Sequence, residues 1–281
     1  MIHGSLYDIL SMTAWRMETP ELSGGLHILM MCAMVISAAV AAALTAGRSR
    51  SSDSSDGMLT RVLAASGWIL MALELYKQLF LFYIVNDGAY DWWYFPFQLC
   101  SVPIYLCISL PFIHGRLRGA VMTFLAGYTL VSALAALIYP QDFLRPYITL
   151  TMHGFIWHGI LLYISLTVIL SGAAYTRSGA AVMDAAILFV ALSIIAVLIN
   201  TAAEPAMQAA YAARRIPHDH AAMFYMNPYH LSPQPLVSSV QMAAGIPPGL
   251  MLYGLVIIAA GSAAAVIPQR IGLGGKKPSD D

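Results

Sequence analysis

Residues 90–107 read YDWWYFPFQLCSVPIYLC, and the rest of the chain can be arranged around this stretch. It begins with tyrosine and tryptophan residues of the kind found at a membrane–water boundary, and it continues as an apolar run. That run carries Gln98 and Cys100, and polar side chains in lipid need a partner or a function. Pro103 has no N–H to give the carbonyl of Leu99, so we expect a bend there and a free acceptor beside the thiol. The stretch predicts a site inside the membrane.

The composition predicts a polytopic membrane protein. The 281 residues are 59% hydrophobic and only 10% charged, whereas soluble domains are about 25% charged. The net charge of zero argues against a nucleic-acid partner, because no basic surface is available to neutralise phosphates. The three cysteines all lie in apolar runs, so free thiols are expected.

Seven apolar segments are each long enough to cross about 30 Å of hydrocarbon as a helix. We therefore predict an all-α fold, a bundle of seven transmembrane helices. The predicted spans are residues 25–47, 62–85, 95–113, 119–139, 147–171, 180–203 and 247–267.

The segments outside the spans complete the predicted organisation. Residues 1–24 lack a signal-peptide pattern, and we expect an interfacial helix there. We also expect a long external loop over residues 204–245 and a polar tail over residues 268–281. Lysine and arginine are more frequent in the loops after the first, third and fifth spans and in the tail. The positive-inside rule then places the N-terminus outside and the C-terminus inside.

Several polar residues share one depth in this topology. Cys100 and His153 each lie about 9 Å below the start of a span that enters from the outside. The second span places Glu74 and Lys77 in the same half of the bilayer, and the sixth span ends near Asn200. We predict a polar pocket that opens outward under the long loop, with Cys100 within hydrogen-bond reach of His153, directly or through one water.

Each of these residues also has a purely structural interpretation. Glu74 and Lys77 lie three residues apart on one helix face and can neutralise each other. A buried free cysteine is usually a small hydrophobic residue, and His153 or His158 can simply hydrogen-bond another helix.

A second polar cluster lies in the long loop. His218, Asp219, His220 and His230 are metal-ligand residue types, but their spacing fits no closed site. The sequence therefore predicts neither a metal nor a cofactor.

A thiol and an imidazole at one depth can support acyl transfer through a thioester. The histidine would take the proton of the cysteine and return it to the leaving group. Gln98, Lys77 and Asn200 are candidates to stabilise the oxyanion. Membrane phospholipids would present ester groups at this level.

Four features resemble a known family. They are the run WWYFPFQLCSVP at 92–103, the His153–Gly154 pair, Asn200, and FYMNPYHLSPQPL at 224–236. Together they resemble the YwaF-like bacterial membrane proteins, which are similar to the eukaryotic transmembrane protein 164 family. The resemblance implies a phospholipid acyltransferase in the bacterial cytoplasmic membrane, with Cys100 as nucleophile and His153, in preference to His158, as base.

Two other classes of membrane protein also cross the membrane several times. A retinal-binding sensor is excluded because residues 247–267 contain no lysine. A small-solute transporter or permease remains the alternative, since Glu74, Lys77 and the proline-containing third span would suit a polar pathway.

Overall fold

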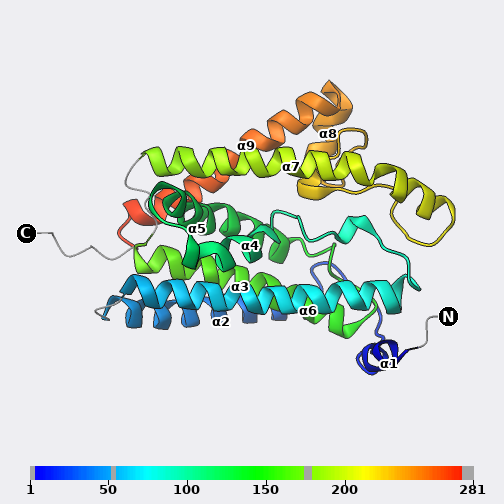
Figure 1. The fold of residues 1–281 in the computed structure, drawn as a ribbon, viewed down its shortest axis with the longest axis horizontal. Coiled ribbons are helices and arrows are strands. Elements are labelled where there is room, and N and C mark those ends of the chain that lie inside the picture. The colour runs from blue at the N-terminus through cyan, green and yellow to red at the C-terminus, as the bar shows by residue number, and fades with distance from the viewer. Residues whose placement is uncertain (1–3, 52–54, 174–178, 274–281) are drawn as a thin grey trace, which may run out of the picture.

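The computed structural model describes residues 4–51, 55–173 and 179–273, and all regular secondary structure in these residues is helical. Figure 1 shows a bundle in which the N-terminal helix α1 (Ser5–Ser11) and the C-terminus lie at opposite ends. Six helices of the described chain are long and apolar enough to cross a membrane. They are α2 (Gly25–Arg50), α3 (Ser55–Phe80, extended by a π-helical turn over Leu81–Val85), α5 (Gly115–Ile138), α6 (Ile148–Ser171), α7 (Gly179–Ala212) and α9 (Ile246–Arg270). The predicted all-α polytopic fold is confirmed.

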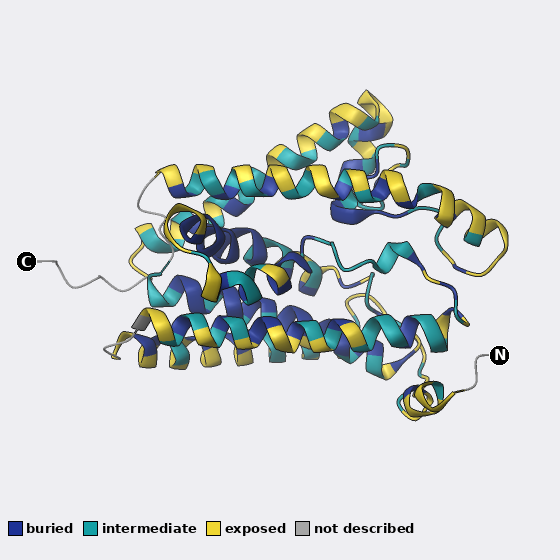
Figure 2. Ribbon diagram, viewed as in Figure 1, coloured by how far each residue is buried: buried dark blue, intermediate teal, exposed yellow. Residues whose placement is uncertain are grey.

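Burial divides these helices into an inner and an outer set. α5 and α6 are the most buried, whereas α2, α7 and α9 expose much of their surface. Figure 2 shows exposed residues along the outer sides of α2 and α7. Many of these residues are large and apolar, such as Leu29, Ile194 and Leu255. An apolar exposed surface on long helices suits contact with lipid.

The third predicted span differs most from the expectation. α4 is a short helix (Val102–Ser109) followed by a 3₁₀ turn (Leu110–Phe112), and residues 95–101 are not helical. Pro103 lies in the first turn of α4, where its missing N–H would be unpaired in any case. It therefore starts the helix, and the predicted bend at this position is wrong.

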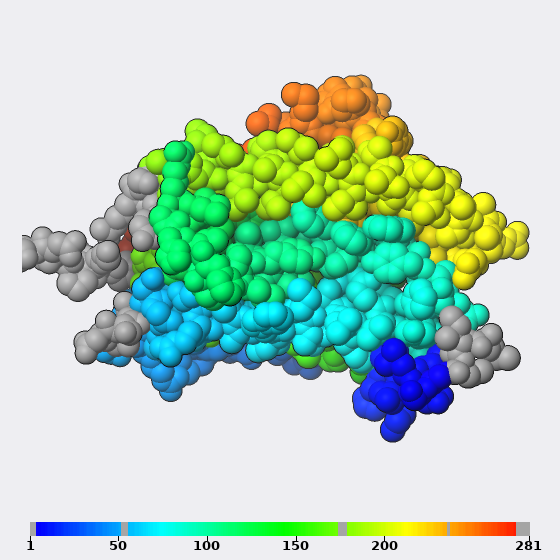
Figure 3. All heavy atoms as spheres, in the orientation of Figure 1, coloured from blue at the N-terminus to red at the C-terminus, as the bar shows by residue number. Residues whose placement is uncertain are grey.

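The irregular backbone before α4 is partly buried between two long helices. Figure 3 shows residues 90–112 filling the space between α3 and α7. Non-helical backbone is tolerated at membrane depth where protein surrounds it. The chain still passes from one end of the bundle to the other through α4, because α3 ends and α5 begins at opposite ends (Figure 1).

The predicted long loop is shorter than expected. The alanine-rich stretch after residue 203 continues α7 to Ala212, with Pro205 inside the helix. Near its other end, Pro235–Ala244 forms α8, which packs on α9. We call the remaining residues 213–234 the cover loop. It lies at the same end of the bundle as α1 (Figure 1).

α5 and α9 cross at a close backbone contact. A Cβ atom on Gly127 would lie 2.0 Å from the carbonyl oxygen of Gly261, and one on Gly261 would lie 2.8 Å from the Tyr128 ring. Small residues allow such an approach between membrane helices. Figure 1 shows α9 inclined to the other long helices as it runs to α8.

Candidate functional site

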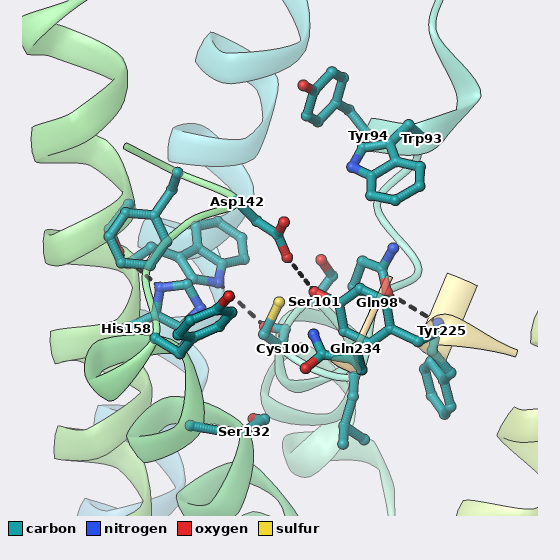
Figure 4. A pocket seen from close by; sticks show the side chains of 18 of the residues that line it. Trp93, Tyr94, Gln98, Cys100, Ser101, Ser132, Asp142, His158, Tyr225 and Gln234 are labelled. Atoms are coloured by element: carbon teal, nitrogen blue, oxygen red, sulfur yellow. Dashed lines mark hydrogen bonds between the residues drawn. The ribbon is translucent and has the colours of Figure 1, made fainter. Parts of the chain in front are cut away.

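A cavity of about 440 Å³ lies beneath the cover loop, within the range of about 300–1,000 Å³ typical of ligand pockets. Apolar side chains of α5, α8 and α9 form much of its wall. Its polar lining residues include Lys77, Gln98, Cys100, Ser101, Asp142, His153, His158, Tyr225, Gln234 and Tyr253. Figure 4 shows the labelled side chains of Cys100, Gln98, Gln234 and His158 around a common space.

The cavity reaches the outer surface between α5 and α9. Ala135 on α5, Tyr139 directly after α5, and Leu252 and Val256 on α9 line the cavity and are themselves exposed. These residues lie on the α8 side of the Gly127–Gly261 crossing. The opening is therefore lateral and largely apolar.

Cys100 lies directly before Ser101, the N-cap residue of α4. Its side chain is half-buried and lines the cavity, and the indole Nε1–H of Trp157 donates to its carbonyl oxygen over 3.2 Å. Lys77 lines the same cavity and brings a positive charge to it. Cys107 is fully buried in the core instead.

Both predicted histidines of α6 line the cavity, so the greater depth of His158 does not separate it from Cys100. His153 Nε2 lies 3.0 Å from the carbonyl of Leu73, and His158 Nδ1 lies 2.8 Å from that of Gly154. A carbonyl only accepts, so each of these nitrogens donates, and the other ring nitrogen keeps the lone pair that a base requires.

The described part of the chain contains no hydrogen bond between the Cys100 thiol and either histidine. The predicted contact between Cys100 and His153, directly or through one water, therefore stays a prediction. The Nε2 atom of His153 instead bonds the neighbouring helix α3.

The ion pair between Glu74 and Lys77 is present. Lys77 Nζ lies 2.8 Å from Glu74 Oε1, and Gln78 donates to the same carboxylate over 2.7 Å. Glu74 is only 3% exposed, so its charge depends on these partners. Lys77 lies nearer the cavity, with Nζ 5.8 Å from the ring centre of Trp157.

Removing one member of this pair should destabilise the protein more than removing both. Glu74→Gln or Lys77→Met leaves a buried charge without its partner, which we expect to cost about 3–5 kcal/mol, whereas the double change leaves none. Thermal unfolding of the detergent-solubilised variants measures the effect. Additive losses across the three variants would show that the two residues are not coupled.

Gln98 and Asn200 hold the cover loop. Gln98 donates to the carbonyl of Ala222 over 3.0 Å and accepts from the N–H of Phe224 over 2.9 Å. Asn200, fully buried, exchanges two hydrogen bonds with the backbone of Met223. Unlike Gln98, Asn200 does not line the cavity. Its carboxamide bonds the backbone of the cover loop, so it does not face the cavity to stabilise an oxyanion as predicted.

The turn that these residues hold is strained. Phe224 and Tyr225 have φ values of 55° and 57°, which non-glycine residues seldom adopt. Tyr225 donates a hydrogen bond to Asp142, and both line the cavity. Burial, and then the Asp142 carboxylate, raise the pKa of Tyr225 well above its usual value, so it remains a donor.

Sequence reasoning missed several lining residues. They are Asp142, Trp157, Tyr225, Gln234 and Tyr253. Tyr225 and Gln234 lie in the 224–236 motif, so the motif could have identified them. Tyr253 carries no such signal, because a tyrosine in an apolar span is usually a packing residue.

The fold and the cavity define a multi-pass helical membrane protein with a laterally open pocket that carries a thiol and two imidazoles. A family model described as the TMEM164 family matches residues 22–259. The chain therefore belongs to the TMEM164 family, which confirms the resemblance to the transmembrane protein 164 proteins. No curated protein and no solved structure matches the chain.

Proposed function

We propose that this membrane protein is a phospholipid acyltransferase or acyl hydrolase that forms a thioester on Cys100. One observation carries the proposal: the Cys100 side chain lines a laterally open, mainly apolar cavity that two histidines share. Cys32 is exposed on α2 and Cys107 is buried in the core. An acyl chain can enter between α5 and α9 without leaving an apolar environment.

The chemistry needs only groups of the cavity and a phospholipid. The Cys100 sulfur attacks the ester carbonyl carbon, the ester C–O bond breaks, and the thiol proton passes through a histidine to the departing lysolipid oxygen. In the second step the hydroxyl of an acceptor lipid, or of water, attacks the thioester. Its proton returns to the sulfur, and a new ester or a fatty acid leaves.

Two groups of the wall can stabilise the oxyanion of both steps. Lys77 brings a positive charge, and the Gln98 amide has one hydrogen left after its bond to Ala222. Hydrogen-bond donors and charges in a site that excludes water are more effective than in solution. Asn200 has no part in this proposal.

A captured acyl-enzyme tests the proposal. The purified chain is incubated with phosphatidylcholine that carries an alkynyl acyl chain, and mass spectrometry locates the hydroxylamine-sensitive adduct. We expect the adduct on Cys100. Solute flux through liposomes without an adduct or lipid turnover would overturn the proposal and favour the transporter.

We also propose that the cavity end of the bundle faces outward across the bacterial cytoplasmic membrane. The support is the excess of basic residues at the other end, which includes Arg48, Arg61 and Arg270. In a Cys32→Ser background, an impermeant maleimide should label Tyr229→Cys in intact cells and leave Arg61→Cys unlabelled. Both positions are exposed. The reverse pattern would place the cover loop inside.

A further inference from the structure

Four side chains of types that can bind a metal meet where the cover loop contacts α7. Asp219, His220 and His230 each offer a ligand atom, and these atoms all lie within 4.8 Å of one another. Glu204, two turns before the end of α7, has Oε1 2.6 Å from Nε2 of His230. None of the four is among the described residues that line the cavity, so the cluster is separate from Cys100.

Two atoms of this cluster are buried without a partner. Nε2 of His220 and Oε2 of Glu204 form no hydrogen bond within the described ranges. Buried polar atoms are almost always paired, and an exception requires an explanation. A cation bound by Nε2 of His220 would satisfy that nitrogen, and its positive charge would stabilise the nearby Glu204 carboxylate.

The two imidazole rings are stacked. The His220 and His230 rings are 4.3 Å apart at their centres and 2° from parallel. Each ring also contacts a carboxylate at 2.6 Å, His220 with Asp219 and His230 with Glu204. The stacked rings and their two carboxylates therefore form one compact group of side chains that can bind a metal.

We propose that Asp219, His220 and His230 bind a divalent transition-metal ion, with Zn²⁺ the best fit, and that Glu204 holds His230 in place. Imidazole nitrogens together with a carboxylate suit Zn²⁺, whereas Ca²⁺ and Mg²⁺ prefer oxygen ligands. Bonds of about 2.0–2.1 Å place tetrahedral ligands about 3.3 Å apart, so the ligand atoms, now within 4.8 Å, draw closer on binding and the stacked rings turn until both nitrogens face the ion. A carboxylate that bonds a ligating histidine fixes the orientation of its ring.

The ion would fasten the cover loop to α7. His218, adjacent in sequence to Asp219, stacks on Trp93 with ring centres 4.5 Å apart and lies 2.7 Å from Asp91. Trp93 lines the cavity. A metal beside this contact would hold the loop in its covering position, and this role does not depend on what the cavity binds.

Metal analysis of the purified full-length chain tests the proposal. The protein carries a streptavidin-binding tag, because a histidine tag would itself bind metal. It is solubilised in detergent, equilibrated with Zn²⁺, desalted and analysed by plasma mass spectrometry. We expect about one Zn²⁺ per chain. We also expect the midpoint of thermal unfolding to rise with Zn²⁺ and to fall with a chelator.

Neighbouring histidines provide matched variants. His220→Gln and His230→Gln should each lower Zn²⁺ affinity at least about tenfold, whereas His218→Gln, which changes a histidine outside the cluster, should keep it. Size-exclusion chromatography identifies the variants that remain folded. Folded wild-type protein without bound Zn²⁺, or folded His220→Gln with unchanged Zn²⁺ affinity, would overturn the proposal. Because the readout is metal content, neither result depends on acyl transfer.

Discussion

Replacing Cys100 by serine should abolish the acyl adduct and reduce lipid turnover by at least about 10³-fold. The expected loss is large because a serine hydroxyl keeps its proton far more tightly than a thiol does. Neither the start of α4 nor the charge of Lys77 would ionise a serine hydroxyl. The variant is incubated with the alkynyl phospholipid, and both the adduct and the released lysolipid are measured.

Cys107→Ser is the matched control for this experiment. Cys107 lies within α4, seven residues after Cys100, but it is fully buried in the core and does not line the cavity. The control should retain the adduct, although a buried hydroxyl lowers stability somewhat. Equal loss of the adduct in both variants, with both folded, would return Cys100 to the status of a packed thiol.

A glutamine in place of the catalytic histidine should slow adduct formation by about 10²–10⁴-fold, the usual contribution of a general base. Glutamine is chosen because its amide can still donate to the carbonyl of Leu73 or Gly154, so the structural hydrogen bond is kept. The rate of the first turnover is measured for His153→Gln and His158→Gln.

The two variants should differ. His153 lies at the same depth as Cys100, which favours it as the base. The hydrogen bonds favour His158, because Nε2 of His153 bonds the Leu73 carbonyl, whereas His158 bonds the Gly154 carbonyl through Nδ1 and keeps Nε2 available. The position with the larger loss identifies the base, and the other variant should stay within about tenfold of the wild-type rate. Rates close to wild type in both folded variants would contradict histidine catalysis.

The membrane helices and one ion pair could be predicted directly from the sequence. Long apolar runs determine membrane helices because unpaired backbone groups are costly in lipid, and six of the seven predicted spans are long helices. The Glu74–Lys77 pair was also predictable, since residues three apart on a helix are neighbours wherever the helix lies. Gln98 and Cys100 were also noticed from the sequence alone, because polar side chains inside an apolar run need a partner or a function.

The tertiary structure decided the rest. The start of α4 at Val102 depends on how residues 95–101 pack between α3 and α7, because non-helical backbone inside a membrane needs partners from other segments. Gln98 and Asn200 were recognised as polar residues at depth, but their partners lie more than twenty residues away in the cover loop.

The same distinction holds for the cluster of Asp219, His220 and His230. Their spacing in the sequence fits no closed metal site, yet the turns of the cover loop bring their ligand atoms together. Local spacing determines which side chains share a helix face. The sequence by itself therefore determined the membrane helices, the Glu74–Lys77 ion pair and the importance of the stretch that contains Cys100. Contacts between distant segments depend on how helices and loops pack, so only the tertiary structure decided the cavity, its lateral opening and this cluster.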